Sequence, residues 1–104
     1  MKVHWTERAR RNLRAIHDYI AEDSPNYAIR MVDRITRKTE SLARFPMLGH
    51  VVPEYEAEQG TEPTVRQILE GNYRVIYRLR PDRVQVLTVI HGARQLPPLE
   101  ALES

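Results

Sequence analysis

Arginines are the residues of this chain best suited to chemistry, and they gather between Thr64 and Arg94. Fourteen of the sixteen basic residues are arginine, and this stretch carries a net charge of +4, because it holds six arginines against two acids. A guanidinium is a planar fork of donors that fits phosphate and carboxylate groups, and it is a poor general base because its pKa stays above about 12. The pattern indicates anion binding or charge stabilisation in phosphoryl transfer. The six arginines are Arg66, Arg74, Arg78, Arg80, Arg83 and Arg94.

The four histidines give little support for a metal site. His4, His17, His50 and His91 fall in four different expected elements, and no two of them have the spacing of a chelating pair. We therefore expect no metal and no cofactor. His91 stands apart because it follows the last expected strand, close to Arg94, and chain segments at strand ends commonly form sites.

Familiar catalytic motifs are not found in the sequence. The chain has no cysteine, which excludes a disulfide scaffold and a thiol nucleophile. It shows no Gly-rich phosphate loop, no Ser-His-Asp order, no nucleophile elbow and no identifiable pair of catalytic carboxylates. Whether the protein is an enzyme stays open, with the balance against it. If it is one, its chemistry must use arginines together with a histidine or carboxylate.

The arginines lie on expected strands. Residues 72–79 alternate between an apolar face and a largely cationic face, which predicts a sheet covered on one side and open and basic on the other. Residues 84–90 are apolar on both faces, which predicts a central strand. The apolar face carries Tyr73, Val75, Tyr77 and Leu79, and the cationic face carries Arg74, Ile76, Arg78 and Arg80.

Two amphipathic helices are expected before these strands. The first follows a short edge strand at residues 2–5 and is capped by Thr6. The second begins at Ser24-Pro25 and runs until Pro46 stops it. Their short connection predicts an antiparallel hairpin. The expected buried stripe of the first helix is Ala9, Leu13, Ile16 and Ile20. That of the second helix is Ala28, Val32, Ile35, Leu42 and Phe45, with Thr39 within the same stripe.

The remaining segments complete the predicted fold. Residues 47–63 form an irregular, acidic connector with a short helical turn near residues 55–58, and turns at 70–72 and 80–83 join three antiparallel strands. The first strand needs a partner, and the doubly apolar last strand is its best neighbour. The fold class is therefore α+β: an N-terminal edge strand, then an antiparallel helical hairpin packed on one face of a small, mainly antiparallel sheet, in the order β-α-α-β-β-β. We expect a single domain over residues 1–104, with a loose tail from about residue 97 to 104.

The composition is that of a soluble globular protein. No apolar run approaches the roughly 20 residues that a membrane helix requires. The charged N-terminal segment does not have the form of a secretory signal, and the lack of cysteine fits a reducing compartment. We therefore expect a cytoplasmic protein without a membrane partner.

Several short motifs, taken in order, resemble the ParE/RelE toxin superfamily of bacterial type II toxin–antitoxin modules. The resemblance extends from residue 3 to about residue 96 and implies a helical hairpin on a small antiparallel sheet. The motifs are W-T-x-x-A-x-x-x-L-x-x-I-x-x-Y-I at 5–20, Phe-Pro-Met-Leu-Gly at 45–49, Val-Pro-Glu at 52–54, Tyr-Arg-Val-Ile-Tyr at 73–77 and Val-Ile-His-Gly-Ala-Arg at 89–94.

The branches of this superfamily differ in their action. RelE-like members resemble a microbial ribonuclease that cleaves messenger RNA within the ribosome, and ParE-like members are associated with poisoning of DNA gyrase. By position, Arg74 and Arg94 match two arginines of the ribonuclease branch, and Arg66 matches one of its first-strand lysines. The second lysine falls near Gln67 or Ile68, and no tyrosine follows residue 77 in the tail. These departures count against RNA cleavage.

The resemblance implies a ParE-like toxin that stabilises a plasmid or a chromosomal locus. It implies inhibition of growth by binding DNA gyrase, and neutralisation by a cognate antitoxin, ParD-like or similar, in a hetero-oligomer. We expect this antitoxin to fold on binding, by helix-in-groove packing or strand addition, and to be acidic where it meets arginines. The residues expected to contact the target or the partner are Arg66, Arg74, Arg78, His91 and Arg94.

Two alternatives stay open. In a RelE-like, ribosome-dependent endoribonuclease, Arg66, Arg74 and Arg94 would bind the scissile phosphate, and His91 or a nearby carboxylate would transfer protons. A non-toxic nucleic-acid-binding module would show strongly salt-dependent affinity for RNA or DNA. For the gyrase hypothesis, charge reversal at Arg78 and Arg94, both expected to be at least partly exposed, should weaken inhibition without unfolding the domain.

Overall fold

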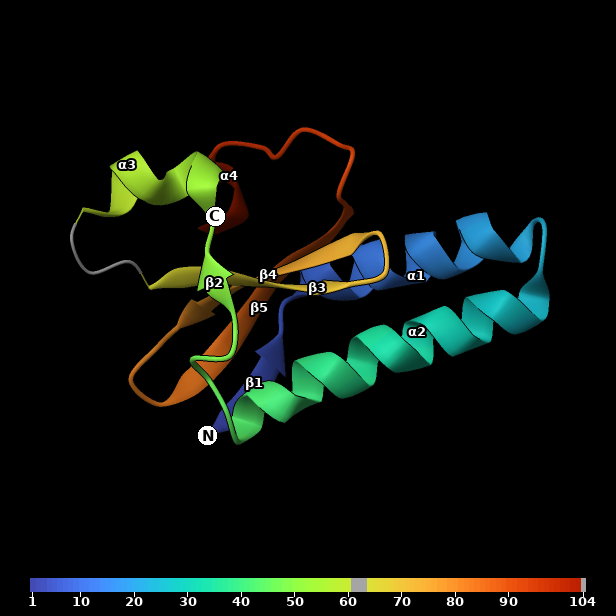
Figure 1. Ribbon diagram of the computed structural model, residues 1–104, viewed down its shortest axis with the longest axis horizontal. Helices are drawn as coiled ribbons and strands as arrows, with labels where there is room; N and C mark the ends of the chain where they lie inside the picture. The colour runs from blue at the N-terminus through green and yellow to red at the C-terminus, as the bar shows by residue number, and fades with distance from the viewer. Residues whose placement is uncertain (61–63, 104) are drawn as a thin grey trace.

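The computed structural model describes residues 1–60 and 64–103 and contains one sheet with helices on both of its faces (Figure 1). Two long helices form a hairpin that projects beyond one end of the sheet. This α+β architecture confirms the predicted fold class. The elements are β1 (Lys2–Trp5), α1 (Glu7–Ala21), α2 (Pro25–Glu40), η1 (Ser41–Ala43), β2 (His50–Val51), η2 (Pro53–Tyr55), α3 (Glu56–Gln59), β3 (Val65–Glu70), β4 (Tyr73–Leu79), β5 (Arg83–His91) and α4 (Leu99–Glu103).

The sheet has five strands in the order β1-β5-β4-β3-β2. β1 pairs with β5 in parallel, and the other neighbours are antiparallel. β5 therefore lies inside the sheet with β1 beside it, as predicted. Gly71, with φ +59, and Asn72 form the turn between β3 and β4, because glycine accepts a positive φ without strain.

The connector is more ordered than the sequence predicted. His50 and Val51 form a two-residue edge strand on β3, and the expected helical turn is present as η2 and α3. Residues 61–63, the end of the connector, lie outside the described residues.

Side-chain caps fix where both long helices begin. Thr6 Oγ1 accepts a hydrogen bond from the Ala9 N–H at 3.2 Å, and Ser24 Oγ accepts one from the Tyr27 N–H at the same distance. The predicted end of the second helix is wrong, because α2 stops at Glu40 and a 3₁₀ turn follows. The tighter winding of that turn takes later residues off the helical stripe, so Phe45 is 56% exposed.

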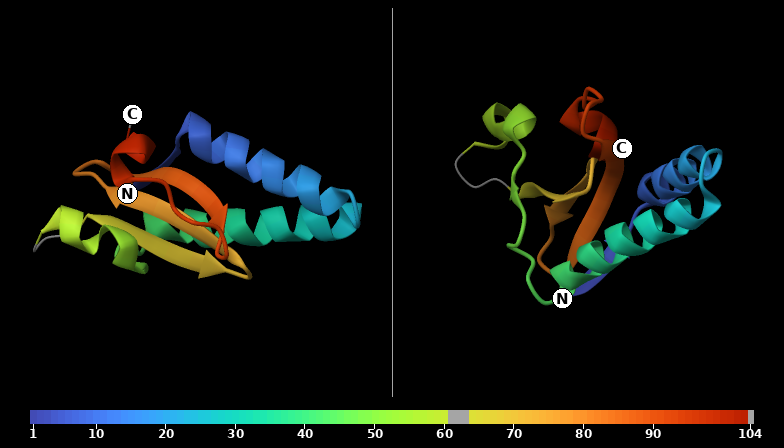
Figure 2. Two further views of the ribbon diagram at one scale, coloured as in Figure 1. Left: turned by 90° about the horizontal axis from the view of Figure 1, so that it is seen from above. Right: turned by 45° about the vertical axis from the view of Figure 1, so that its right-hand side comes forward.

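Two apolar layers hold the fold together, one on each face of the sheet. Figure 2 shows α1 and α2 on one side of the sheet and α3 and α4 on the other. α1 and α2 pack on the face that carries Tyr77 and Val86. The opposite face was expected to be open and basic, and this prediction is wrong. η2 and α4, together with Val52 before η2, cover it with apolar side chains that the alternating pattern of one strand does not reveal. The second layer consists of Val52, Tyr55, Val65, Ile76, Leu87, Leu99 and Leu102.

The C-terminal tail is part of this second layer. Leu99 and Leu102 in α4 are 6% and 4% exposed, so the expectation of a loose tail is wrong for residues 99–103. The two leucines are three positions apart, which places both on one side of a helical turn. Burial of each leucine stabilises α4 on the sheet, by about 1.5–3 kcal/mol for a fully buried side chain.

Candidate functional site

All three guanidinium nitrogens of Arg74 on β4 donate hydrogen bonds within the fold. Its Nε donates to Gln67 Oε1 at 2.7 Å, and Nη1 and Nη2 donate to the two carboxylate oxygens of Glu54 at 2.7 and 2.9 Å. The Arg74 side chain is only 11% exposed, against 46% for Glu54. The hydrogen bond from Arg74 holds the pKa of the Glu54 carboxyl below its ordinary value, against the opposing effect of burial. Arg74 thus holds η2 against the sheet, and no adjacent pair of its N–H donors is free to bind a phosphate.

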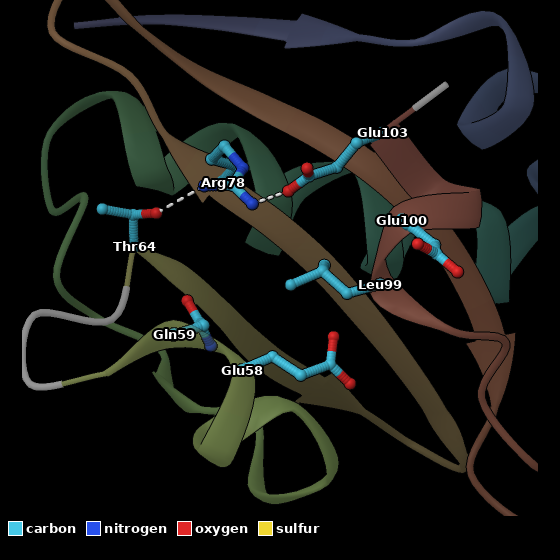
Figure 3. Close-up of a pocket in the computed structure, with 7 residues that line it drawn as sticks. All are labelled: Glu58, Gln59, Thr64, Arg78, Leu99, Glu100 and Glu103. Atoms are coloured by element: carbon cyan, nitrogen blue, oxygen red, sulfur yellow. Dashed lines mark hydrogen bonds and ion pairs between the residues drawn. The ribbon is translucent and has the colours of Figure 1, made fainter.

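Arg78, four residues after Arg74 and on the same face of β4, is also occupied (Figure 3). It donates to Thr64 Oγ1 at 2.8 Å and forms an ion pair with Glu103 of α4. Burial lowers the pKa of the Arg78 guanidinium, and the nearby Arg80 adds to this effect. Its side chain is 19% exposed, so the prediction of partial exposure is confirmed, but the exposed part is small. Around it lies a cavity of about 330 Å³, with Leu99 of α4 in its wall.

Arg66 faces the other way. It pairs with Tyr77 across β3 and β4, and directly opposite residues in antiparallel strands share a face. Tyr77 belongs to the helix-facing layer, so the sheet separates Arg66 from Arg74 and Arg78. Arg66 Nη1 donates to the Gly49 carbonyl at 2.8 Å, and within the described residues its buried Nε has no partner. The arginines assigned to one phosphate site are therefore not brought together.

His91 ends β5 and faces Tyr73. Their rings meet edge to face with centroids 5.3 Å apart, and burial raises the pKa of the Tyr73 phenol. His91 Nδ1 accepts a hydrogen bond from the Ala93 N–H at 3.0 Å, so the neutral ring carries its proton on Nε2. The turn that follows is closed by the Arg94 N–H, which donates to the His91 carbonyl at 3.0 Å.

Arg94 is the one predicted site arginine with a free side chain in the part of the chain that the structure describes. It is exposed and lines a groove of about 950 Å³ between α1, the end of β5 and the segment that follows. His91 and Tyr73 line both this groove and a second hollow of about 560 Å³ beside Arg74. The end of β5 therefore joins His91 and Arg94 in one surface, which is the best candidate site of the molecule.

Asn12 of α1 is a member of this site that the sequence analysis missed. Its Oδ1 accepts hydrogen bonds from Thr88 Oγ1 at 2.5 Å and from the Val89 N–H at 3.2 Å. The only signal in the sequence is a polar residue beside the apolar stripe of a helix, which is too common to be informative. Gln67 and Glu103 were missed for a related reason, because each meets its arginine only through the tertiary fold.

Metal and membrane sites receive no support from the described ranges, 1–60 and 64–103. No group of three or more histidine, cysteine, aspartate or glutamate residues there could hold a metal ion. Among the same residues, no helix is both long and apolar enough to cross a membrane.

Two solved toxin–antitoxin structures share this fold. The chromosomal ParDE system of P. aeruginosa aligns with a TM-score of 0.67 and 23% identity, covering 88% of this chain and 95% of that chain. The RelBE2 complex of Mycobacterium tuberculosis aligns with a TM-score of 0.53 and 22% identity, covering 86% and 95%. At these identities the likeness is one of fold.

The sequence matches the family described as the ParE toxin of type II toxin–antitoxin system, parDE, over residues 3–96. The chain therefore belongs to this family and is the toxin component of a type II toxin–antitoxin system, which confirms the resemblance read from the motifs. It is similar to Y4kP of Sinorhizobium fredii, with 34% identity over 98 residues, 92% of this chain and 93% of that protein. It is also similar to toxin RelE2 of Caulobacter vibrioides, with 32% identity over 94 residues, 89% and 97% of the two chains.

Proposed function

We propose that this toxin inhibits growth by binding DNA gyrase in the cytoplasm, and that a cognate antitoxin neutralises it within a plasmid-stabilising or chromosomal module. The surface involved is the end of β5 with His91 and Arg94. Membership of this family supports both the role as a toxin and the existence of an antitoxin partner, because the family is the toxin half of a two-protein system.

One observation favours target binding over RNA cleavage. Arg74 and Arg78 are held by Glu54 and Glu103, and Arg66 lies on the opposite face of the sheet. A phosphoryl-transfer site needs several cations converging on one phosphate in a preorganised array. Of these four arginines, only Arg94 has a side chain without a partner among the described residues, so the arrangement fits a contact surface better than a catalytic centre.

Two assays on the purified toxin separate the hypotheses. The proposal expects inhibition of gyrase supercoiling at micromolar toxin or below, and intact messenger RNA on translating ribosomes. Cleaved, ribosome-bound messenger RNA with unaffected supercoiling would support the RelE-like alternative instead. Salt-dependent binding of free RNA or DNA without growth arrest would support the non-toxic nucleic-acid-binding module.

The proposal also predicts the behaviour of cells. Expression of the chain alone should slow or stop bacterial growth, and co-expression of the small protein encoded beside it should restore growth. Harmless expression, at verified levels of soluble protein, would count against the whole proposal.

A further inference from the structure

The exposed side of α2 carries arginines that the candidate site at the end of β5 does not use. Arg30, Arg34 and Arg37 are exposed, and their spacing of four and then three positions places them on one side of the helix. Arg44 is exposed as well and follows the 3₁₀ turn η1. Figure 1 shows α2 along the lower side of the helical hairpin, and no residue of α2 lines the groove that contains Arg94. We call these four residues the α2 arginine row.

The guanidinium groups of this row keep most of their donors free. Arg34 donates one N–H to Glu70 at 2.7 Å, and Arg37 Nε lies 3.0 Å from a carboxylate oxygen of Asp33. The side chains of Arg34 and Arg37 are both more than half exposed, and ion pairs at such positions contribute little. Among the described residues, the other guanidinium donors of the row have no partner.

Aromatic rings restrain the two ends of the row. The guanidinium carbon of Arg30 lies over the ring of Tyr27, 5.8 Å from its centroid, and that of Arg44 lies over the ring of Phe45 at 5.6 Å. A guanidinium that stacks on a ring uses its flat face, so the N–H donors at its edge stay available. The stacking also limits the freedom of the side chain, which lowers the entropic cost of holding it against a ligand.

The spacing of the row indicates the kind of anion that it fits. From Arg30 to Arg44 the row measures about 20 Å, because an α-helix rises about 1.5 Å per residue. Cations spread over this length do not converge on a single phosphate, but they are complementary to a long polyanion. Duplex DNA carries one phosphate charge about every 1.7 Å along its axis, so the row meets phosphates in any register. The planar fork of arginine also matches phosphate oxygens.

We propose that the exposed side of α2 binds the phosphate backbone of duplex DNA through the α2 arginine row. The contact is independent of base sequence, because phosphates carry no sequence information. When the toxin acts on gyrase, which holds DNA, the end of β5 contacts the protein and α2 contacts the DNA. This role in inhibition rests on the proposed function, whereas the DNA contact by itself does not.

Fluorescence anisotropy of the purified, full-length toxin with a labelled duplex of about 20 base pairs tests the DNA contact. The logarithm of the affinity should fall with the logarithm of the salt concentration with a slope of about −3 to −4, since each neutralised phosphate contributes about −0.9. Lack of binding at low salt would overturn the proposal. Binding to vesicles of phosphatidylglycerol and phosphatidylethanolamine without binding to DNA would overturn it too.

Two single substitutions locate the contact. Arg37→Gln should weaken binding to every duplex sequence on the order of fivefold and make the salt slope shallower by about 1. Asp33→Asn should tighten binding on the order of twofold, because it removes the carboxylate that pairs with Arg37. A row that only stabilises the helix would not produce the tighter binding.

The matched control is Arg14→Gln, the same change of charge at an exposed position of α1. It should leave the affinity for DNA within about twofold of the wild-type value, because Arg14 lies outside the row. Equal weakening by Arg14→Gln and Arg37→Gln would show a diffuse attraction by the whole protein, and would refute the α2 arginine row as the site.

A supercoiling assay separates this inference from the proposed function. The double variant Arg30→Gln with Arg37→Gln should need on the order of tenfold more toxin to inhibit gyrase, at an unchanged circular dichroism spectrum. Weaker inhibition with unchanged affinity for DNA would mean that the row contacts protein, and the proposal would be wrong. If the wild type binds DNA through the row but leaves supercoiling unaffected, the proposed function fails and the DNA contact stands.

Discussion

The hydroxyl of Tyr77 accepts a hydrogen bond of 3.0 Å from the backbone N–H of Gly49, and both residues are buried. The same hydroxyl donates to the Pro46 carbonyl at 3.0 Å. Burial raises the pKa of the phenol, so it stays protonated and keeps this donor. One side chain of β4 therefore holds the segment 46–49, which includes most of the Phe-Pro-Met-Leu-Gly motif, against the sheet.

Tyr77→Phe should destabilise the protein without changing its fold. The substitution keeps the ring but leaves the buried Gly49 N–H without an acceptor, at a cost of about 1–3 kcal/mol. Urea unfolding followed by circular dichroism measures the change. Tyr27→Phe is the control, since Tyr27 is 41% exposed and should tolerate the loss of its hydroxyl. Equal stability of the two variants would show that the hydroxyl is not needed.

Gly49→Ala should be more harmful than an alanine elsewhere in the loops. A Cβ at Gly49 would lie 2.5 Å from the Gln67 carbonyl oxygen and 2.5 Å from Tyr77 Oη, so the backbone has to shift. Overpacking of this kind costs about 1–3 kcal/mol. At Gly92 the nearest atom would be 3.2 Å away, so Gly92→Ala should cost less. Thermal unfolding of both variants ranks them, and a reversed order would contradict the geometry.

The Arg74–Glu54 pair makes stability depend on acidic pH. The pKa of Glu54 is depressed in the folded state, so the pair stabilises the fold above the ordinary value of 4.5. That contribution disappears as pH falls through the lower, folded pKa. Glu54→Gln should therefore cost about 0.5–1 kcal/mol at neutral pH, a modest figure because Glu54 is partly exposed, and progressively less below pH 4.5. A difference that is constant from pH 7 to pH 3 would be inconsistent with this ion pair.

Ending the chain after Pro98 should weaken the whole fold. The truncation removes Leu99 and Leu102 from the second apolar layer and leaves Arg78 without its carboxylate. We expect a loss of about 3 kcal/mol from the lost burial, together with binding of a hydrophobic dye to the uncovered sheet. Glu100→Gln, at an exposed position of the same helix, is the control. An unchanged unfolding curve after truncation would mean that the tail is loose in solution.

The parts of the fold that local sequence determines were predictable. The caps and the turn are specified by the chemistry of single residues, Thr6 and Ser24-Pro25 for the caps and Gly71-Asn72 for the turn. The long helices and strands could be predicted from the periodicity of their apolar residues. β2 and α4 were missed because two and five residues are too short to show a period. Their positions depend on burial against β3 and β5, which only the assembled sheet provides.

The candidate site was less predictable, for a physical reason. His91 and Arg94 were found because they follow a recognisable strand, whereas the carboxylates that occupy Arg74 and Arg78 are distant in sequence. The separation of Arg66 from Arg74 on opposite faces of the sheet could have been predicted from the sequence. Counting outward from the two-residue turn pairs Arg66 with Tyr77 and so assigns it to the helix-facing side.

Charge reversal at Arg94 tests the contact surface of the toxin most directly. Arg94 is exposed and its side chain has no partner among the described residues, so Arg94→Glu should fold normally. If the end of β5 contacts gyrase, the toxin concentration needed to inhibit supercoiling should rise on the order of tenfold, because the charge at this position of the contact surface is reversed. Arg14→Glu, an equal change at an exposed position of α1 outside the groove, should leave inhibition near the wild-type level.

Arg78→Glu, by contrast, should not be informative about the target. It places a carboxylate beside Glu103 in a largely buried position and should release α4, so any loss of inhibition would reflect loss of structure. The decisive pair is therefore Arg94→Glu and Arg14→Glu, compared at equal circular dichroism and equal unfolding midpoints. Inhibition that is unaffected by Arg94→Glu would exclude the end of β5 as the gyrase-binding surface. If neither variant nor the wild type affects supercoiling, and ribosome-bound messenger RNA is cut, the toxin acts as the RelE-like alternative describes.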